Sequence, residues 1–173
     1  NSTAFAVYWL GSDASGISSY DVQYEDGAGG TWTDWITSTA SISGTFTGQD
    51  GHTYYFQSRA LDIPGNLEAY PGGNGDAGTT VDTTLPSGSI WVNGGALATT
   101  SPSVTLGLLA NGASYRAFSN DGASFTDWEA YATSKQWVLP GDDGSKAVHV
   151  KFKDLAANVS APYSTTVDLA TAI

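Results

Sequence analysis

Two stretches of the chain decide its fold, because the second repeats the first. Tyr20-Asp-Val-Gln-Tyr-Glu-Asp-Gly27 is followed by Trp32-Thr-Asp-Trp35, and Tyr115-Arg-Ala-Phe-Ser-Asn-Asp-Gly122 is followed by Phe125-Thr-Asp-Trp128. Such self-similarity indicates that one structural unit occurs twice along the chain. The sequence therefore predicts two related domains in tandem.

Shorter segments recur in the same order after these stretches. Asp62-Ile-Pro-Gly-Asn66 corresponds to Asp154-Leu-Ala-Ala-Asn158, and Thr79-Thr-Val-Asp82 corresponds to Thr165-Thr-Val-Asp168. Between the copies, the proline and glycine of Thr83-Thr-Leu-Pro-Ser-Gly88 interrupt strand continuity. We therefore expect one domain over residues 1–83 and a second over residues 87–173.

Each copy consists of short segments in which apolar residues alternate, separated by turn pairs such as Asp26-Gly27 and Asn111-Gly112. Alternation with a period of two is typical of half-buried strands, and no window has the period of a helix. The expected class is all-β. The inward residues predicted for the two cores are Phe5, Val7, Trp9, Tyr20, Val22, Trp35, Phe56 and Ala60, then Val104, Leu106, Leu108, Trp128, Val148, Val150 and Phe152.

The charge and composition exclude several classes of protein. With 6 Lys and Arg against 17 Asp and Glu, the net charge is −11, which disfavours binding to nucleic acid. The longest apolar run, Phe5–Leu10, is far short of the roughly 20 residues of a membrane span. The absence of Cys excludes disulfides and thiol catalysis. A start without Met or a signal-peptide pattern predicts a piece of a longer, processed or trimmed polypeptide.

The first half resembles a fibronectin type III-like domain of bacterial secreted proteins. The resemblance rests on Val7-Tyr-Trp9, on Phe56-Gln-Ser-Arg-Ala60 and on Gly51-His-Thr-Tyr54, where the family has a corner tyrosine that bonds nearby backbone. The second half resembles a bacterial immunoglobulin-like repeat through Phe118-Ser-Asn-Asp-Gly122 and Phe152-Lys-Asp-Leu-Ala-Ala-Asn-Val-Ser160. The resemblance implies two tandem β-sandwiches from a large secreted or surface protein.

No set of residues in the sequence favours catalysis. The two histidines, His52 and His149, do not occupy matching positions of the repeat, and no Gly-x-Ser-x-Gly motif occurs. Most aspartates lie in turns beside glycine, where the side chain bonds its own backbone. We therefore expect a protein that is not an enzyme.

Calcium is the cofactor that the sequence permits, through oxygen ligands in loops. The candidate ligands are Asp62, Asn66, Asp82, Asp154 and Asn158. The alternative interpretation is structural, because an Asp and an Asn four residues apart can lock a turn by bonds to its backbone. Recurrence of the pair in both copies favours the turn lock, and a bound calcium ion stays open.

Two tryptophans are candidates for binding a ligand. Trp35 and Trp128 occupy the same position of the repeat, which favours a core role, whereas Trp91 and Trp137 have no counterpart. A flat ring can stack on a sugar, so a glycan is one possible ligand of Trp91 and Trp137. Packing against a neighbouring domain is the alternative for Trp91.

The first copy lacks the strand that opens the second. Phe5–Trp9 aligns with Val104–Leu108, but no segment precedes it to match Ser89–Asn93. A sheet edge without its neighbour leaves backbone groups unpaired, which permits strand addition by another chain. Trimming of the upstream sequence is the alternative explanation.

Together these observations predict a non-catalytic extracellular module with a structural or adhesive role. The expected partners are neighbouring modules of the same chain or array, together with a glycan or another cell-surface ligand. The alternative prediction is a carbohydrate-binding accessory module of a secreted hydrolase.

Overall fold

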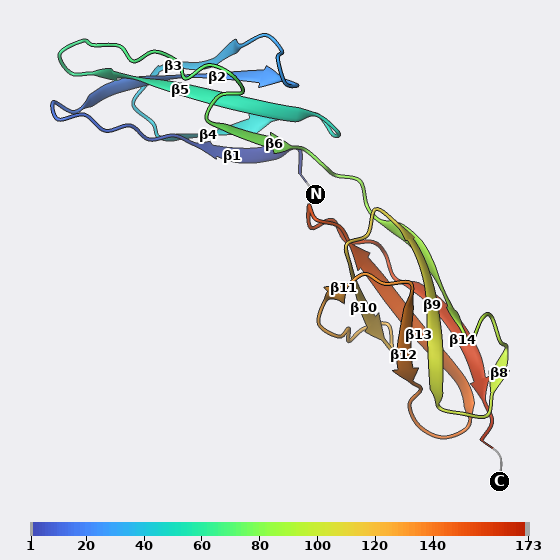
Figure 1. The fold of residues 1–173 in the computed structure, drawn as a ribbon. Coiled ribbons are helices and arrows are strands. Elements are labelled where there is room, and N and C mark those ends of the chain that lie inside the picture. The colour runs from blue at the N-terminus through green and yellow to red at the C-terminus, as the bar shows by residue number, and fades with distance from the viewer. Residues whose placement is uncertain (1, 172–173) are drawn as a thin grey trace. The chain divides into compact units, whose positions relative to one another are not determined.

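The computed structural model describes residues 2–171, in which every regular element is a β-strand (Figure 1). This confirms the all-β class. The chain divides into two compact units, unit 1 (Asn1–Thr83) and unit 2 (Thr84–Ile173). Among the described residues, no helix has the length and apolar character that crossing a membrane requires.

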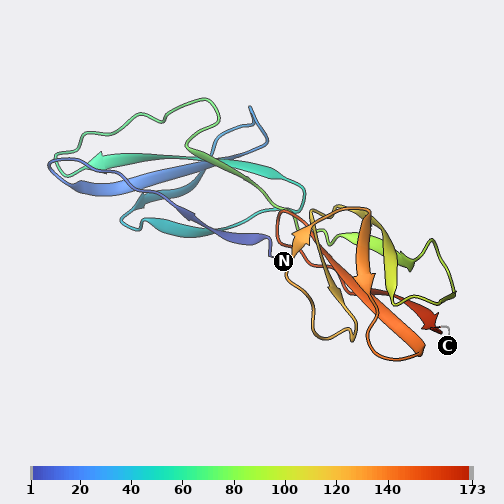
Figure 2. The ribbon, with the colours of Figure 1, turned by 60° about the horizontal axis from the view of Figure 1, so that its bottom comes forward.

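Unit 1 consists of two antiparallel sheets. Its strands are β1 (Ala4–Tyr8), β2 (Ile17–Asp26), β3 (Thr33–Thr39), β4 (Ser43–Thr47), β5 (Thr53–Asp62) and β6 (Ala77–Thr80). One sheet has the order β3-β2-β5-β6, and the other, within residues 2–83, consists of β1 and β4. Figure 2 shows the same ribbon from a second side.

The interior of unit 1 contains two small clusters of buried side chains. Tyr20, Val22 and Ala60 surround Trp9, while a second cluster gathers around Phe46. Of the predicted core residues, Trp9, Tyr20, Val22, Phe56 and Ala60 are buried as expected, and Phe5, Val7 and Trp35 are half-buried against the clusters.

The predicted tyrosine corner is present in unit 1. Tyr54 is 4% exposed, and its hydroxyl accepts a hydrogen bond from the backbone N–H of Gln49 at 3.0 Å. This bond fixes the chain just before β5 begins, as the resemblance implied.

Unit 2 also has two sheets, and its smaller sheet has one strand more than the smaller sheet of unit 1. Its strands are β7 (Ser87–Val92), β8 (Ala98–Thr99), β9 (Ser103–Asn111), β10 (Tyr115–Ser119), β11 (Glu129–Ala130), β12 (Ser134–Val138), β13 (Gly144–Lys153) and β14 (Tyr163–Leu169). The sheet orders are β12-β9-β7 and β11-β10-β13-β14-β8, with β8 parallel to β14. A single continuous cluster fills the space between the sheets.

The core prediction for unit 2 is confirmed except at Trp128. Val104, Leu106, Leu108, Val148, Val150 and Phe152 are all at most 2% exposed. Trp128 is 37% exposed, and the ammonium group of Lys153 lies 4.6 Å from its ring centroid. Since Phe152 points into the core, Lys153 is on the outer face of β13, and Trp128 lies on that outer face with it. Phe118, which was not predicted, supplies a buried ring instead.

Candidate functional site

The turn after β5 is closed by Asp62, one of the predicted calcium ligands. One carboxylate oxygen accepts bonds from the N–H groups of Gly65 and Asn66, at 2.7 and 2.6 Å. The other accepts a bond from the side-chain amide of Asn66, and the backbone N–H of Asp62 donates to the carbonyl of Asn66. Both carboxylate oxygens are therefore engaged within the turn.

Unit 2 repeats this arrangement after β13. Asp154 accepts bonds from the backbone N–H and the side-chain amide of Asn158, each at 2.8 Å, and its own N–H donates to the carbonyl of Asn158. Ala157 takes a φ of 67° inside this turn. The pair lies deeper than in unit 1, because Asn158 is 2% exposed whereas Asn66 is on the surface.

The structure does not gather the predicted ligands into a metal cluster. Asp82 lies exposed after β6, and the two Asp–Asn pairs are in different units. Among residues 2–171, no group of three or more His, Asp or Glu side chains is arranged to hold a metal ion. The bonds inside the turns support the turn-lock interpretation, and calcium binding stays a prediction.

The two tryptophans predicted to bind a ligand are both half-buried in unit 2. Trp91 on β7 is opposite Gly107 on β9, and its indole ring covers the space that a side chain at Gly107 would need. The ring of Trp137 packs on Phe118 at 5.5 Å between centroids, and its N–H donates to the side-chain oxygen of Asn120 at 2.8 Å. Packing within unit 2 thus accounts for much of each ring's surface.

The more accessible aromatic rings of unit 2 lie on the outer face of β10 and β13. Tyr115 and Trp128 are 36% and 37% exposed, and the Lys153 ammonium group lies within 5.0 Å of both ring centroids. Lys151 is placed in the same way over Phe125, at 4.3 Å. Sequence analysis missed this surface because it assigned Trp128 to the core. Lys151 and Lys153 stand on either side of Phe152 in the sequence, and this alternation was the signal that could have indicated an outer face here.

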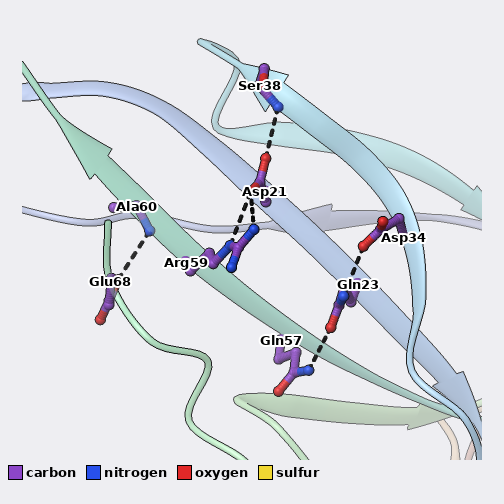
Figure 3. A network of polar contacts seen from close by, with 8 residues as sticks. All are labelled: Asp21, Gln23, Asp34, Ser38, Gln57, Arg59, Ala60 and Glu68. Atoms are coloured by element: carbon purple, nitrogen blue, oxygen red, sulfur yellow. Dashed lines mark hydrogen bonds and ion pairs between the residues drawn. The ribbon is translucent and has the colours of Figure 1, made fainter. Parts of the chain in front are cut away.

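The outer face of the four-stranded sheet of unit 1 has a network of polar bonds (Figure 3). Arg59 on β5 donates twice to one oxygen of Asp21 on β2, and the backbone N–H of Ser38 donates to the other. The bond from Ser38, with help from Arg59, holds the pKa of Asp21 below its usual range. Beside this pair, Gln23 donates to Asp34 and accepts a bond from Gln57.

Three buried atoms in unit 1 have no hydrogen-bond partner among the described residues. They are one side-chain oxygen each of Glu25 and Gln57 and the hydroxyl oxygen of Tyr70. The ring of Tyr70 stacks on the guanidinium group of Arg59 at 4.6 Å, and burial raises the pKa of its hydroxyl. Buried polar atoms without partners are rare in folded proteins and indicate unfilled bonding capacity.

Unit 1 has an open groove of about 780 Å³ beside the end of β1. We call it the unit 1 groove. One wall is the end of β1 and the residues that follow, up to Asp13, and the other is formed by the loop between β5 and β6. That loop is the long green segment that follows β5 in Figure 1. Core residues such as Val22 and Ala60 form its floor, and its other lining residues include Tyr8, Asp13, Glu68 and Asp76.

Comparison with known proteins identifies the fold. Over 97% of its length, the chain is similar to solved fibronectin(III)-like modules of CbhA from Clostridium thermocellum, with 14% identity, a TM-score of 0.55 and 86% of that structure covered. A central fibronectin III array of RIM-binding protein has 14% identity and a TM-score of 0.37, over 98% of this chain and 64% of the array. That second score is too low to support an argument.

No family model matches the chain, and no curated protein matches it. The likeness to solved structures therefore establishes a fibronectin III-like β-sandwich fold and nothing finer. The immunoglobulin-like assignment of the second half stays a prediction.

Proposed function

We propose that this chain is a non-catalytic structural or adhesive part of a larger secreted or cell-surface protein. The observation that carries the proposal is the repetition of one sandwich within the chain, with turns and cores built from corresponding residues. The second support is that the carboxylates in turns and on the sheet of unit 1 bond to backbone, amide or guanidinium groups. Fibronectin III-like modules generally serve as spacers or linkers, which fits this construction.

Its partners in this proposal are neighbouring modules of the same polypeptide or array. An antibody raised against the chain tests the extracellular placement. Intact cells of the source organism and their culture medium should bind the antibody before lysis. A signal that appears only after lysis would contradict the proposal.

A second candidate function, carbohydrate binding beside a secreted hydrolase, is favoured by the aromatic surface on β10 and β13. Trp128 and Tyr115 present partly open rings next to lysine ammonium groups, whereas Trp91 and Trp137 are packed. A glycan array should then show binding that Trp128→Ala abolishes. Trp91→Ala and Trp137→Ala, which change the two tryptophans that the sequence analysis named as glycan-binding candidates, serve as matched comparisons. Absence of glycan binding by the unmodified chain would reject this second function.

A further inference from the structure

The aromatic surface of unit 2 combines rings with positive charges. The loop between β10 and β11 places Phe125 against the ammonium group of Lys151 and Trp128 against that of Lys153, and Tyr115 of β10 flanks Lys153 from the neighbouring strand. These five residues make up the aromatic surface. Contact with the rings restricts where each ammonium group can lie, so the charges are positioned before any ligand arrives.

A comparison with unit 1 shows that these charges lack an internal partner. Lys151 corresponds to Arg59, because each lies three residues before the aspartate of its turn. Arg59 is opposite Asp21 on the neighbouring strand and pairs with it at 2.8 Å, whereas Lys151 is opposite Ala117. Neither Lys151 nor Lys153 forms an ion pair among residues 2–171. Unit 2 therefore presents cations at a position where unit 1 neutralises its own.

Acidic side chains in the same part of unit 2 do not cancel these charges. Glu129 pairs with Arg116 and Lys135. Asp121 accepts bonds from backbone N–H groups of its own turn. The exposed Asp127 forms no ion pair within the part of the chain that the structure describes. The aromatic surface is thus a positive site on a chain whose net charge is −11.

The combination of open rings and ammonium groups favours an acidic sugar over other anions. Tyr115 and Trp128 are both exposed, and such rings can stack on the C–H face of a sugar. A nucleic acid carries about one charge per 1.7 Å of duplex, and binding it requires many cationic contacts. Two lysines do not supply them, and the remaining charge of the chain repels a densely charged ligand. A polysaccharide with separated acidic groups needs contact only at this surface.

We propose that the aromatic surface binds an acidic polysaccharide, whose carboxylate or sulfate groups contact Lys151 and Lys153 while a sugar ring stacks on Trp128. Two residues of extended strand separate the lysines by about 7 Å, so both can contact acidic groups of one polysaccharide chain. The proposal rests on the carbohydrate-binding function given above as the second candidate, and it adds the class of sugar and the residues that select it.

Pairs of probes that differ only in charge test the proposal with the complete chain. Polygalacturonate and its fully methyl-esterified form share one sugar, and dextran sulfate and dextran share another. Calorimetric titration should show binding of at least one acidic member, more weakly as salt is added, and its neutral partner should bind at least roughly tenfold less well. The member that binds identifies carboxylate or sulfate as the preferred group. Binding of neither acidic polysaccharide would overturn the proposal.

Lysine variants separate a local contact from general attraction. Lys153→Gln removes the charge between two rings and should weaken binding of the acidic probe roughly tenfold, while Lys153→Arg should keep most of it. Lys146→Gln is the matched control, because it removes one charge from the same strand at a position near Gly141 and should leave binding unchanged. An equal loss in the two Lys→Gln variants would overturn the proposal.

Tryptophan variants test the stacking contact. Trp128→Ala should weaken binding of the acidic probe at least roughly tenfold although both lysines remain. Trp137→Ala, which removes a ring packed on Phe118, is the control, and circular dichroism spectra establish that each variant is folded. Unchanged affinity in Trp128→Ala would mean that the lysines act as a simple ion-exchange site, and the proposal would be wrong.

Amide chemical shifts locate the bound probe. Addition of the acidic polysaccharide should shift the signals of Tyr115, Trp128 and Lys153 and leave those of Asp21 and Arg59 in place. Shifts confined to unit 1 would overturn the proposal. Vesicles of phosphatidylserine and phosphatidylcholine and duplex DNA are the competing probes. If either binds more tightly than both acidic polysaccharides and depends on Lys153, the ligand is not a sugar and the proposal is wrong.

The failure of this proposal can be told apart from the failure of carbohydrate binding. If neutral and acidic sugars bind equally and Trp128→Ala abolishes both, carbohydrate binding stands and the acidic class is wrong. If no glycan binds at all, both are wrong. Neither result would affect the extracellular structural role, which the antibody experiment tests separately.

Discussion

Unit 1 and unit 2 descend from one pattern of residues, yet their interiors differ. In unit 2, β7 covers one edge of β9, and a single cluster runs through the whole sandwich. Among the described residues of unit 1, β1 pairs only with β4, and the interior separates into a cluster around Trp9 and a cluster around Phe46. Among the described residues, the sandwich with the additional edge strand thus has one continuous core, and the other has two.

This difference predicts unequal stability within one chain. Burying apolar surface is the main favourable contribution to folding, and domains of this size have a small margin. Unit 2 should therefore unfold at the higher temperature. The following changes test the comparison.

The largest effect is expected from Phe152→Ala in unit 2. The ring is fully buried between Tyr131 and Tyr163, at centroid distances of 6.0 and 5.8 Å, so its removal leaves a cavity that costs about 3–5 kcal/mol. Trp9→Ala in unit 1 should fall in the same range, because the ring also loses a bond from its N–H to the carbonyl of Ser41. Calorimetry of the whole chain should show one transition lowered by each variant. A loss below about 1 kcal/mol for either would show that the strand's inward face is misassigned.

The next largest loss of stability is expected from a change at Gly107, the residue opposite Trp91. Gly107→Ala places a methyl group where the Trp91 indole lies, so the ring must move, at a cost of about 1–3 kcal/mol. Tyr8→Ala changes the corresponding position of unit 1, where the side chain is 76% exposed, and should alter stability by less than about 0.5 kcal/mol. If Trp91→Ala does not reduce the penalty of Gly107→Ala, the contact between the two residues is not its cause.

The two turn locks should differ in strength. Asp154→Ala removes the partner of a buried Asn158 and should cost about 1–3 kcal/mol, while Asp62→Ala, beside the exposed Asn66, should cost less. Thermal melts with calcium and with a chelator should show the same loss for each variant. The turn would instead be a metal site if two results occurred together. The chelator alone would lower the melting temperature of the unmodified chain by the same amount, and the melting temperature of the variant would not respond to calcium.

The smallest effect is expected on acidification. Bonds from the Ser119 hydroxyl and from the N–H groups of Ser124 and Ala123 lower the pKa of Asp121 to about 2. Since the pKa of an unfolded Asp is about 3.9, this carboxylate stabilises unit 2 above about pH 4, and the contribution disappears as pH falls towards about 2. Asp121→Asn should make the melting temperature of unit 2 less dependent on pH over this interval. An equally steep dependence in the variant would show that other carboxylates, such as Glu129, are responsible.

The alternating strands and the tyrosine corner could be predicted from the sequence because each depends on local spacing. Val104, Leu106 and Leu108 are two residues apart and all face inward, and Tyr54 bonds a residue only five positions away. Trp128 could not be placed in this way. Its counterpart Trp35 lies inside β3, but Trp128 precedes β11, which has only two residues, and its environment comes from Lys153 on a distant strand.

The unit 1 groove and the aromatic surface of unit 2 could not be predicted from the sequence for the same reason. Glu68 and Asp76 come from a loop with no regular pattern, and only the fold brings them opposite β1. Similarly, Tyr115 and Trp128 share one surface because the ammonium group of Lys153, on the distant strand β13, lies near both rings. Sites assembled from long-range contacts leave little trace in local periodicity.

The short parallel pair of β8 and β14 gives unit 2 a distinct response to pulling force. Leu97 and Thr99 accept backbone bonds from Asp168 and Ala170, which tie the segment that follows β7 to the last strand of the unit. Tension along the polypeptide draws parallel neighbours in opposite directions, so these bonds are loaded in shear and must break together. Among the described residues, unit 1 pairs its strands only in antiparallel fashion and has no such tie. Under tension, we therefore expect unit 2 to resist extension at this pair of strands.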